Sequence, residues 1–212
     1  MEGEKHIYFI RHGETEGNVS PVKPGYDPPL TPLGVKQAMF VAKRCERLPV
    51  EIIIASPLSR TQETARVIAE CIHKDVRKEE LVTEWIYPKS QIGMLKKDLP
   101  PLIEQISDDS DAQKAFPDGE SFSELKHRAI QFMKKAEQYE QGEVLVVTHQ
   151  VFTQMLAACV FFGESLTHKE FERILKHLEL SNTGIGVFEI FPDKKEEERW
   201  RLLTWNDRAH LG

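Results

Sequence analysis

The feature that most constrains the fold is an alternation of short apolar runs with segments of helical periodicity. Runs of the kind that form strands buried on both faces occupy residues 7–10, 51–55 and 143–148. Each is followed, directly or after a polar loop, by a segment whose apolar residues recur at helical spacing. Helices that connect parallel strands cover both faces of the sheet. The sequence therefore predicts an α/β fold, a three-layer α/β/α sandwich around a mostly parallel sheet.

Local signals place the ends of the helices and the remaining strands. A hydroxyl side chain that caps a helix, followed by proline or by a glutamate three residues on, marks a helix start. Such starts occur at Thr31-Pro32, Ser56-Pro57 and Ser121-Phe122-Ser123-Glu124. A further apolar helix is expected over residues 151–162, ending at Gly163. Additional strands are expected at residues 80–84, 184–191 and 199–205.

The length of 212 residues suits one domain. We expect a single domain over residues 1–212. Residues 85–119 have weak periodicity and several prolines, which indicates a lid-like insertion with one short helix. An insertion of this kind is where we expect the specificity for the substrate to reside.

Charge and composition exclude several kinds of protein. The net charge is -6 and no long basic block is present, which argues against binding to nucleic acid. The apolar runs are too short to cross a bilayer, so no membrane span is expected. Three widely spaced cysteines form no metal-ligand or redox pattern. We therefore expect a cytoplasmic protein with reduced thiols, and oligomerisation stays open.

Chemically active side chains follow four of the expected strands. In parallel sheets, ligands bind beyond the carboxyl ends of the strands. The residues that would meet there are Arg11 and His12, Arg60 after Ser56, Glu84, and His149 after Thr148. Neither a glycine-rich phosphate loop nor a dinucleotide fingerprint competes for that edge. The sequence therefore predicts one polar site built from two histidines, two arginines and a glutamate.

This set of residues suits phosphoryl transfer. Two guanidiniums can bind the oxygens of a phosphoryl group and compensate its charge, so the scheme needs no metal and no other cofactor. A neutral imidazole can attack phosphorus and form a phosphohistidine. Glu84 is placed to protonate the leaving oxygen, with Glu14 and Glu120 as alternative acids.

The motifs that carry these residues resemble those of the histidine phosphatase superfamily, which has the phosphoglycerate mutase-like fold. They are Arg11-His12-Gly13-Glu14-Thr15 with Asn18, Leu30-Thr31-Pro32-Leu33-Gly34, Ser56-Pro57-Leu58-Ser59-Arg60-Thr61, Gly119-Glu120-Ser121 and Val147-Thr148-His149. The resemblance covers about residues 6–190 in the order typical of the family. It implies that His12 is the phosphorylated nucleophile and that Arg11, Arg60 and His149 complete the phosphate pocket. It also implies that Thr15 and Asn18 contribute to phosphate binding and that Glu84 is the acid and base.

Two departures from the family pattern bear on the substrate. Glu84 is followed by Trp85-Ile86-Tyr87-Pro88 where many bacterial members have a glycine and a Trp-Glu-Gly segment. The second histidine is followed by Gln150 rather than glycine, and this side chain could narrow the pocket or bind substrate. The longer acid-site motif of the glycolytic mutases is missing, which favours hydrolysis of a small phosphorylated molecule. A mutase and a non-catalytic phosphate-binding module are the alternatives.

Overall fold

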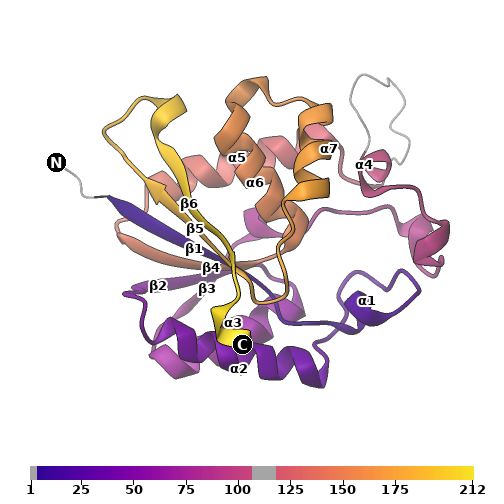
Figure 1. The fold of residues 1–212 in the computed structure, drawn as a ribbon, viewed down its shortest axis with the longest axis horizontal. Coiled ribbons are helices and arrows are strands. Elements are labelled where there is room, and N and C mark those ends of the chain that lie inside the picture. The colour runs from indigo at the N-terminus through magenta and orange to yellow at the C-terminus, as the bar shows by residue number, and fades with distance from the viewer. Residues whose placement is uncertain (1–3, 107–117) are drawn as a thin grey trace.

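The computed structural model describes residues 4–106 and 118–212. A six-stranded sheet has the order β3-β2-β4-β1-β5-β6. Helices α5, α6 and α7 cover one face of this sheet and α2 and α3 cover the other (Figure 1). The predicted α/β sandwich is therefore confirmed.

Four strands form the parallel part of the sheet. They are β1 (Lys5–Arg11), β2 (Ile52–Ala55), β3 (Val76–Lys78) and β4 (Glu143–Thr148). Strand β5 (Ile185–Ile190) pairs antiparallel with β1, and β6 (Trp200–Asp207) pairs antiparallel with β5. The carboxyl ends of β1, β2 and β4 therefore meet at one edge, whereas β5 begins at that edge.

The helices follow the local signals of the sequence. The seven α-helices of the described residues are α1 (Glu16–Val19), α2 (Pro32–Cys45), α3 (Ser59–Ile72), α4 (Leu102–Gln105), α5 (Phe122–Glu137), α6 (Gln150–Phe162) and α7 (His168–His177). The Thr31 side chain caps α2 by accepting from Gly34 N at 3.0 Å. Ser121 and Glu124 form the predicted capping box of α5. Helix α7 was not predicted, although Thr167 and Glu170 carry the same signal.

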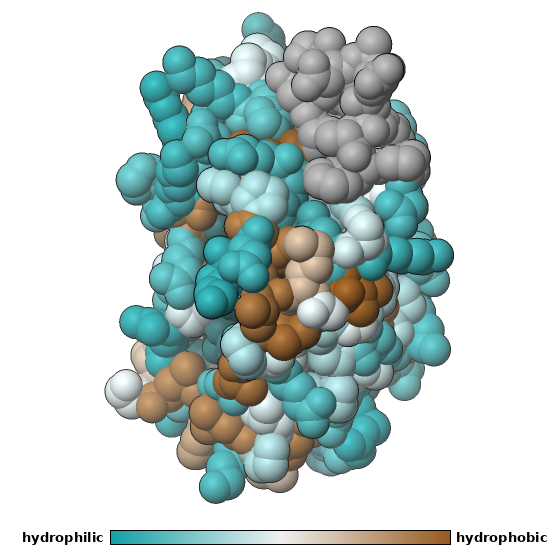
Figure 2. Space-filling view, turned by 90° about the vertical axis from the view of Figure 1, so that its right-hand side faces the viewer, coloured by the Kyte–Doolittle hydropathy of each residue, from teal (hydrophilic) through white to brown (hydrophobic). Residues whose placement is uncertain are grey.

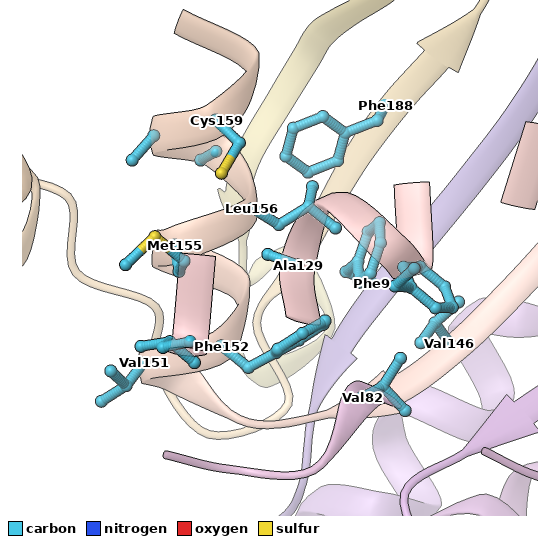
Figure 3. Packing of buried hydrophobic residues seen from close by; sticks show 14 of the residues in the cluster. Phe9, Val82, Ala129, Val146, Val151, Phe152, Met155, Leu156, Cys159 and Phe188 are labelled. Carbon is cyan, nitrogen blue, oxygen red and sulfur yellow. The ribbon is translucent and has the colours of Figure 1, made fainter. Parts of the chain in front are cut away.

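Alternation along the central strands explains why both faces need a helical layer. Phe9 of β1 and Val146 of β4 point toward α5 and α6, where they pack near Phe152 and Leu156 (Figure 3). Their neighbours Ile10 and Val147 point to the opposite face, against α2 and α3. Both faces of these strands are buried. Burial on both sides holds the strand ends, and with them the polar edge, in a fixed register.

The structure departs from the prediction at two elements that lead to the site. The strand expected at residues 80–84 is wrong: β3 ends at Lys78, and residues Glu80–Val82 form a 3-10 turn. Glu84 therefore reaches the edge from a turn rather than from a strand end. Helix α3 begins at Ser59, because Ser56 still makes a sheet-like bond to the Val147 carbonyl at 3.1 Å.

The segment that follows Glu84 contains the expected short helix, α4, and 3-10 turns at Lys89–Gln91 and Lys96–Asp98. It is tied to the loop after α1, since Lys23 N donates to Met94 O at 2.8 Å and Gly93 N donates to Lys23 O at 3.0 Å. Figure 2 shows apolar surface at the centre of this side of the molecule. Residues 107–117 of the predicted insertion lie outside the described residues, and the division into one domain with a lid stays a prediction. Over residues 4–106 and 118–212, every helix is too short or too polar to cross a membrane.

Candidate active site

The ends of β1, β2 and β4 are joined by backbone hydrogen bonds beyond the sheet itself. His12 N donates to Thr148 O at 3.0 Å, and Ser56 N donates to Val147 O at 3.1 Å. Arg60 is the second residue of α3, and His149 directly precedes α6. The structure thus brings four of the predicted residues, Arg11, His12, Arg60 and His149, to one edge.

His12 is held so that one ring nitrogen points into the site. Its Nδ1 lies 2.7 Å from the Gly13 carbonyl oxygen, which can only accept, so Nδ1 carries the hydrogen. Nε2 therefore carries the lone pair, which accepts a hydrogen bond from Arg60 Nε at 3.2 Å. The side chain is buried, with 4% of the residue exposed. This is the orientation that attack by Nε2 on phosphorus requires.

Close approach of two glycines places the loop that carries His12. A Cβ atom added to Gly13 would clash with the Gly34 carbonyl, and one added to Gly34 would clash with the Glu14 carbonyl. The absence of side chains therefore allows the start of α2 to pack against the loop. Gly13 N also donates to Thr64 Oγ1 of α3 at 3.1 Å. Two helices on one face of the sheet thus fix the position of the loop that carries His12.

Buried polar atoms without partners surround His12. His149 lies with its ring centroid 5.2 Å from that of His12, and its Nε2 is 2.9 Å from Ser56 Oγ. Its Nδ1 is buried and has no hydrogen-bond partner in the described residues, and the same is true of Arg11 Nε. The NH1 group of Arg11 donates a hydrogen bond to Leu180 O at 2.7 Å, which anchors the side chain. Unpaired buried donors are costly, and an oxyanion would satisfy them.

Electrostatics favour neutral imidazoles beside charged guanidiniums. Burial, with Arg60 and Arg11 adding to it, lowers the pKa of His12 well below 6.5. Burial and the charge of Arg60 likewise lower the pKa of His149 well below 6.5. Burial also lowers the pKa of Arg11 and Arg60, with Glu84 opposing it. The site therefore holds unprotonated imidazoles and can accept a phosphate anion.

These lowered pKa values predict acid sensitivity of the fold. Below pH 6.5, His12 and His149 bind protons in the unfolded chain, whereas in the folded chain they stay neutral until a much lower pH. The free energy of unfolding should therefore fall as pH decreases from 6.5, by up to about 1.4 kcal/mol per pH unit for each imidazole. Urea denaturation between pH 7.5 and 5 measures this slope. The double variant His12→Gln, His149→Gln should flatten it, whereas His177→Gln, at an exposed position, should not. An unchanged slope in the double variant would contradict the prediction.

Glu84 reaches the same edge through the start of α6. Its carboxylate accepts from Phe152 N at 3.1 Å, Val151 N at 3.3 Å and Trp85 N at 3.0 Å. These contacts place it beside His149, and its charge acts on Arg11 and Arg60. The two alternative acids are engaged elsewhere: Arg128 holds both oxygens of Glu120, and Thr31 Oγ1 donates to Glu14.

The three remaining predicted binding residues, Thr15, Asn18 and Gln150, differ in what they can offer. The Thr15 hydroxyl is buried and donates to Asn18 Oδ1 at 3.0 Å, so it orders the loop. Asn18 Oδ1 also accepts from Thr15 N at 2.9 Å, so the oxygen of this amide orders the same loop. Gln150 is the half-buried first residue of α6, directly after His149.

Two contacts of the site were not anticipated. Asn182 Nδ2 donates to the His12 carbonyl at 3.0 Å and to Asn18 Oδ1 at 3.3 Å. Ser56, the partner of His149, could have been found from its position directly after β2. Asn182 could not have been found in this way, because it precedes a strand and does not follow one. Strand β5 runs antiparallel to β1, so it begins at the edge where the other strands end. In the described part of the chain, no three His, Cys, Asp or Glu side chains gather as a possible metal site.

Comparison with known proteins identifies the family. The model of the histidine phosphatase superfamily (branch 1) matches residues 7–208. The chain belongs to the histidine phosphatase superfamily. The resemblance inferred from the motifs is thereby confirmed.

Named members of this superfamily that are similar to the chain include both mutases and phosphatases. The chain is 31% identical to the probable phosphoglycerate mutase GpmB of Salmonella arizonae, over 97% of this chain and 94% of that protein. A mycobacterial glucosyl-3-phosphoglycerate phosphatase superposes with a TM-score of 0.77 at 23% identity, covering 96% of this chain and 99% of that one. A phosphoserine phosphatase from Entamoeba histolytica gives 0.72 at 26% identity, over 97% and 98%.

Proposed function

We propose that this protein hydrolyses a phosphomonoester by way of a phosphohistidine at His12. The observation that carries the proposal is the orientation of His12: Nδ1 is tied to the Gly13 carbonyl, and Nε2 faces Arg60 at a buried edge where Arg11 Nε and His149 Nδ1 have no partner among the described residues. A phosphoryl group there would accept hydrogen bonds from Arg11, Arg60 and His149.

The reaction would proceed in two displacements. In the first, Nε2 of His12 forms a bond to phosphorus while the bond to the leaving oxygen breaks, and Glu84 gives that oxygen a proton. In the second, a water molecule attacks the phosphohistidine and transfers a proton to Glu84. Inorganic phosphate then leaves and Nε2 recovers its lone pair. The two guanidiniums compensate the charge on the equatorial oxygens in both steps, and the scheme uses no metal or other cofactor.

Hydrolysis is favoured over mutase action by the groups near the pocket. A mutase has to retain a molecule with two phosphates, which calls for a second set of cations. Among the described residues, two lysines near Glu84 already have partners: Lys23 lies 3.9 Å from the Tyr87 ring centroid, and Lys96 donates to Gly17 O at 2.6 Å. The carboxylate of Asp27 lies 3.5 Å from Arg60 and would repel a second phosphate. A single phosphate suits this arrangement better.

Product analysis tests the proposal. The purified protein should release inorganic phosphate and free alcohol in equal amounts from at least one member of a phosphomonoester panel that includes 3-phosphoglycerate. Conversion of 3-phosphoglycerate to its 2-isomer, stimulated by 2,3-bisphosphoglycerate and faster than phosphate release, would identify a mutase instead. Vanadate binding without turnover of any substrate in the panel would identify a non-catalytic module.

A further inference from the structure

An ion pair between Arg128 of α5 and Glu120, which lies just before that helix, has no role in the chemistry described so far. One guanidinium edge of Arg128 binds the Glu120 carboxylate at both oxygens: Nε donates to Oε1 and NH2 donates to Oε2, each at 2.7 Å. The exposed fractions of the two side chains are 15% and 8%. The guanidinium carbon also lies 5.2 Å from the Phe152 ring centroid.

This pair holds the backbone on both sides of Glu84. On the preceding side, Arg128 donates to Thr83 O at 2.6 Å and to Leu81 O at 2.8 Å. On the following side, Glu120 Oε2 accepts from Ile86 N at 3.3 Å, and the Glu120 carbonyl accepts from Trp85 Nε1 at 2.7 Å. The chain from residue 81 to residue 86 is thus clamped at both ends.

The clamp formed by Arg128 and Glu120 holds the backbone around Glu84, which lies outside any strand. Glu84 follows a 3-10 turn, and β3 ends six residues before it. A buried ion pair is weak evidence for stability, because desolvation offsets most of its attraction. Its value here is therefore geometric: the planar fork of Arg128 binds one carboxylate and the carbonyls of Leu81, Thr83 and Glu84.

We propose that Arg128 and Glu120 are positioning residues that hold the Glu84 carboxyl against the leaving oxygen of the substrate. This inference rests on the proposed role of Glu84 as proton donor. A misplacement of about 1 Å in a catalytic group can cost about a hundredfold in rate. Loss of the clamp should therefore impair protonation of the leaving group and spare attack by His12.

Leaving groups of different basicity separate the two effects. p-Nitrophenyl phosphate releases a stabilised anion that needs no proton, whereas an alkyl phosphate such as glycerol phosphate releases a basic alkoxide. Arg128→Met should lower kcat/KM for the alkyl phosphate by about 10- to 100-fold and for p-nitrophenyl phosphate by less than about threefold. Glu120→Gln, which keeps the shape of the side chain, should give the same pattern more weakly.

Arg199→Met is the matched control. Arg199, which directly precedes β6, forms a partly buried ion pair at 2.7 Å with Glu137, the last residue of α5. Within the described part of the chain, this pair makes no hydrogen bond to the segment around Glu84. Its loss should change both substrates equally. An equal loss on both substrates in Arg128→Met as well would show a general structural role and overturn the inference. If Arg128→Met does not fold, Arg128→Lys and Glu120→Gln provide the same comparison.

A double variant separates this inference from the proposed function. In a Glu84→Gln background, Arg128→Met should add no further loss that depends on the leaving group. An additional loss of that kind, with Glu120→Gln as damaging as Glu84→Gln, would make Glu120 the donor and overturn the clamp. If Glu84→Gln alone shows no dependence on the leaving group, the acid assignment fails and the clamp with it, while formation of phosphohistidine at His12 would stand.

Discussion

Replacement of His12 by alanine is expected to lower kcat at least about a thousandfold, because it removes the atom that bonds to phosphorus. The three groups that would bind phosphate keep contacts that do not involve His12: Arg11 donates to Leu180 O, Arg60 donates to Tyr26 O, and His149 contacts Ser56 Oγ. Rapid acid-free quenching after incubation with a radiolabelled substrate should yield an acid-labile, alkali-stable phosphoenzyme in the unaltered protein and none in the variant.

A histidine away from the pocket provides the control for this experiment. His177 is exposed at the end of α7, so His177→Ala should retain both turnover and labelling. Wild-type rates in His12→Ala, or a label that survives the substitution, would rule out the proposed mechanism.

Arg60→Met should lower kcat/KM by about 10²- to 10³-fold, the usual cost of losing one donor to a charged transition state. Arg60 is positioned to serve both reacting partners, because its Nε lies 3.2 Å from His12 Nε2 and its NH1 donates to Tyr26 O at 3.2 Å. Removal of its charge also removes one cause of the lowered pKa of His12, so that pKa should rise toward its ordinary value. The acidic limb of the kcat/KM profile should accordingly move to higher pH.

The neighbouring Arg66 tests whether the loss is specific to the site. It lies on the same helix and forms an exposed pair with Glu70 at 2.8 Å, so Arg66→Met should change kcat/KM little. Arg60→Lys keeps the charge but loses the planar fork, and its activity should fall between those of the unaltered protein and Arg60→Met. A kcat/KM within a few fold of the unaltered value in Arg60→Met would remove Arg60 from the mechanism.

Local sequence patterns predicted most of the residues that lie at the polar edge of the sheet. Arg11, His12 and His149 directly follow long strands of buried residues, and Arg60 stands at a helix start after a third strand. Strand burial and the carboxyl-end rule were therefore enough to bring these four together. Glu84 was assigned to the right edge by the wrong route, because a three-residue edge strand followed by a 3-10 turn leaves almost no periodic signal.

Other contacts depend on elements that meet only after folding. Asn182 reaches the His12 carbonyl because β5 runs antiparallel to β1, and strand direction is set by pairing across 170 positions rather than by neighbouring residues. Arg128 meets the backbone around Glu84 because the rotation of α5 about its axis turns that side chain inward, 45 residues away from Thr83.

The amino-acid sequence thus specified the family, the α/β architecture and the edge at which the proposed nucleophile meets the arginines, since these depend on periodicity and on short motifs whose geometry is local. The tertiary structure decided how Glu84 is held, which other carboxylates are already hydrogen-bonded, and which ring nitrogen of His12 carries the lone pair. Those properties depend on hydrogen bonds between side chains that are distant in the sequence, and no local sequence pattern predicts such contacts.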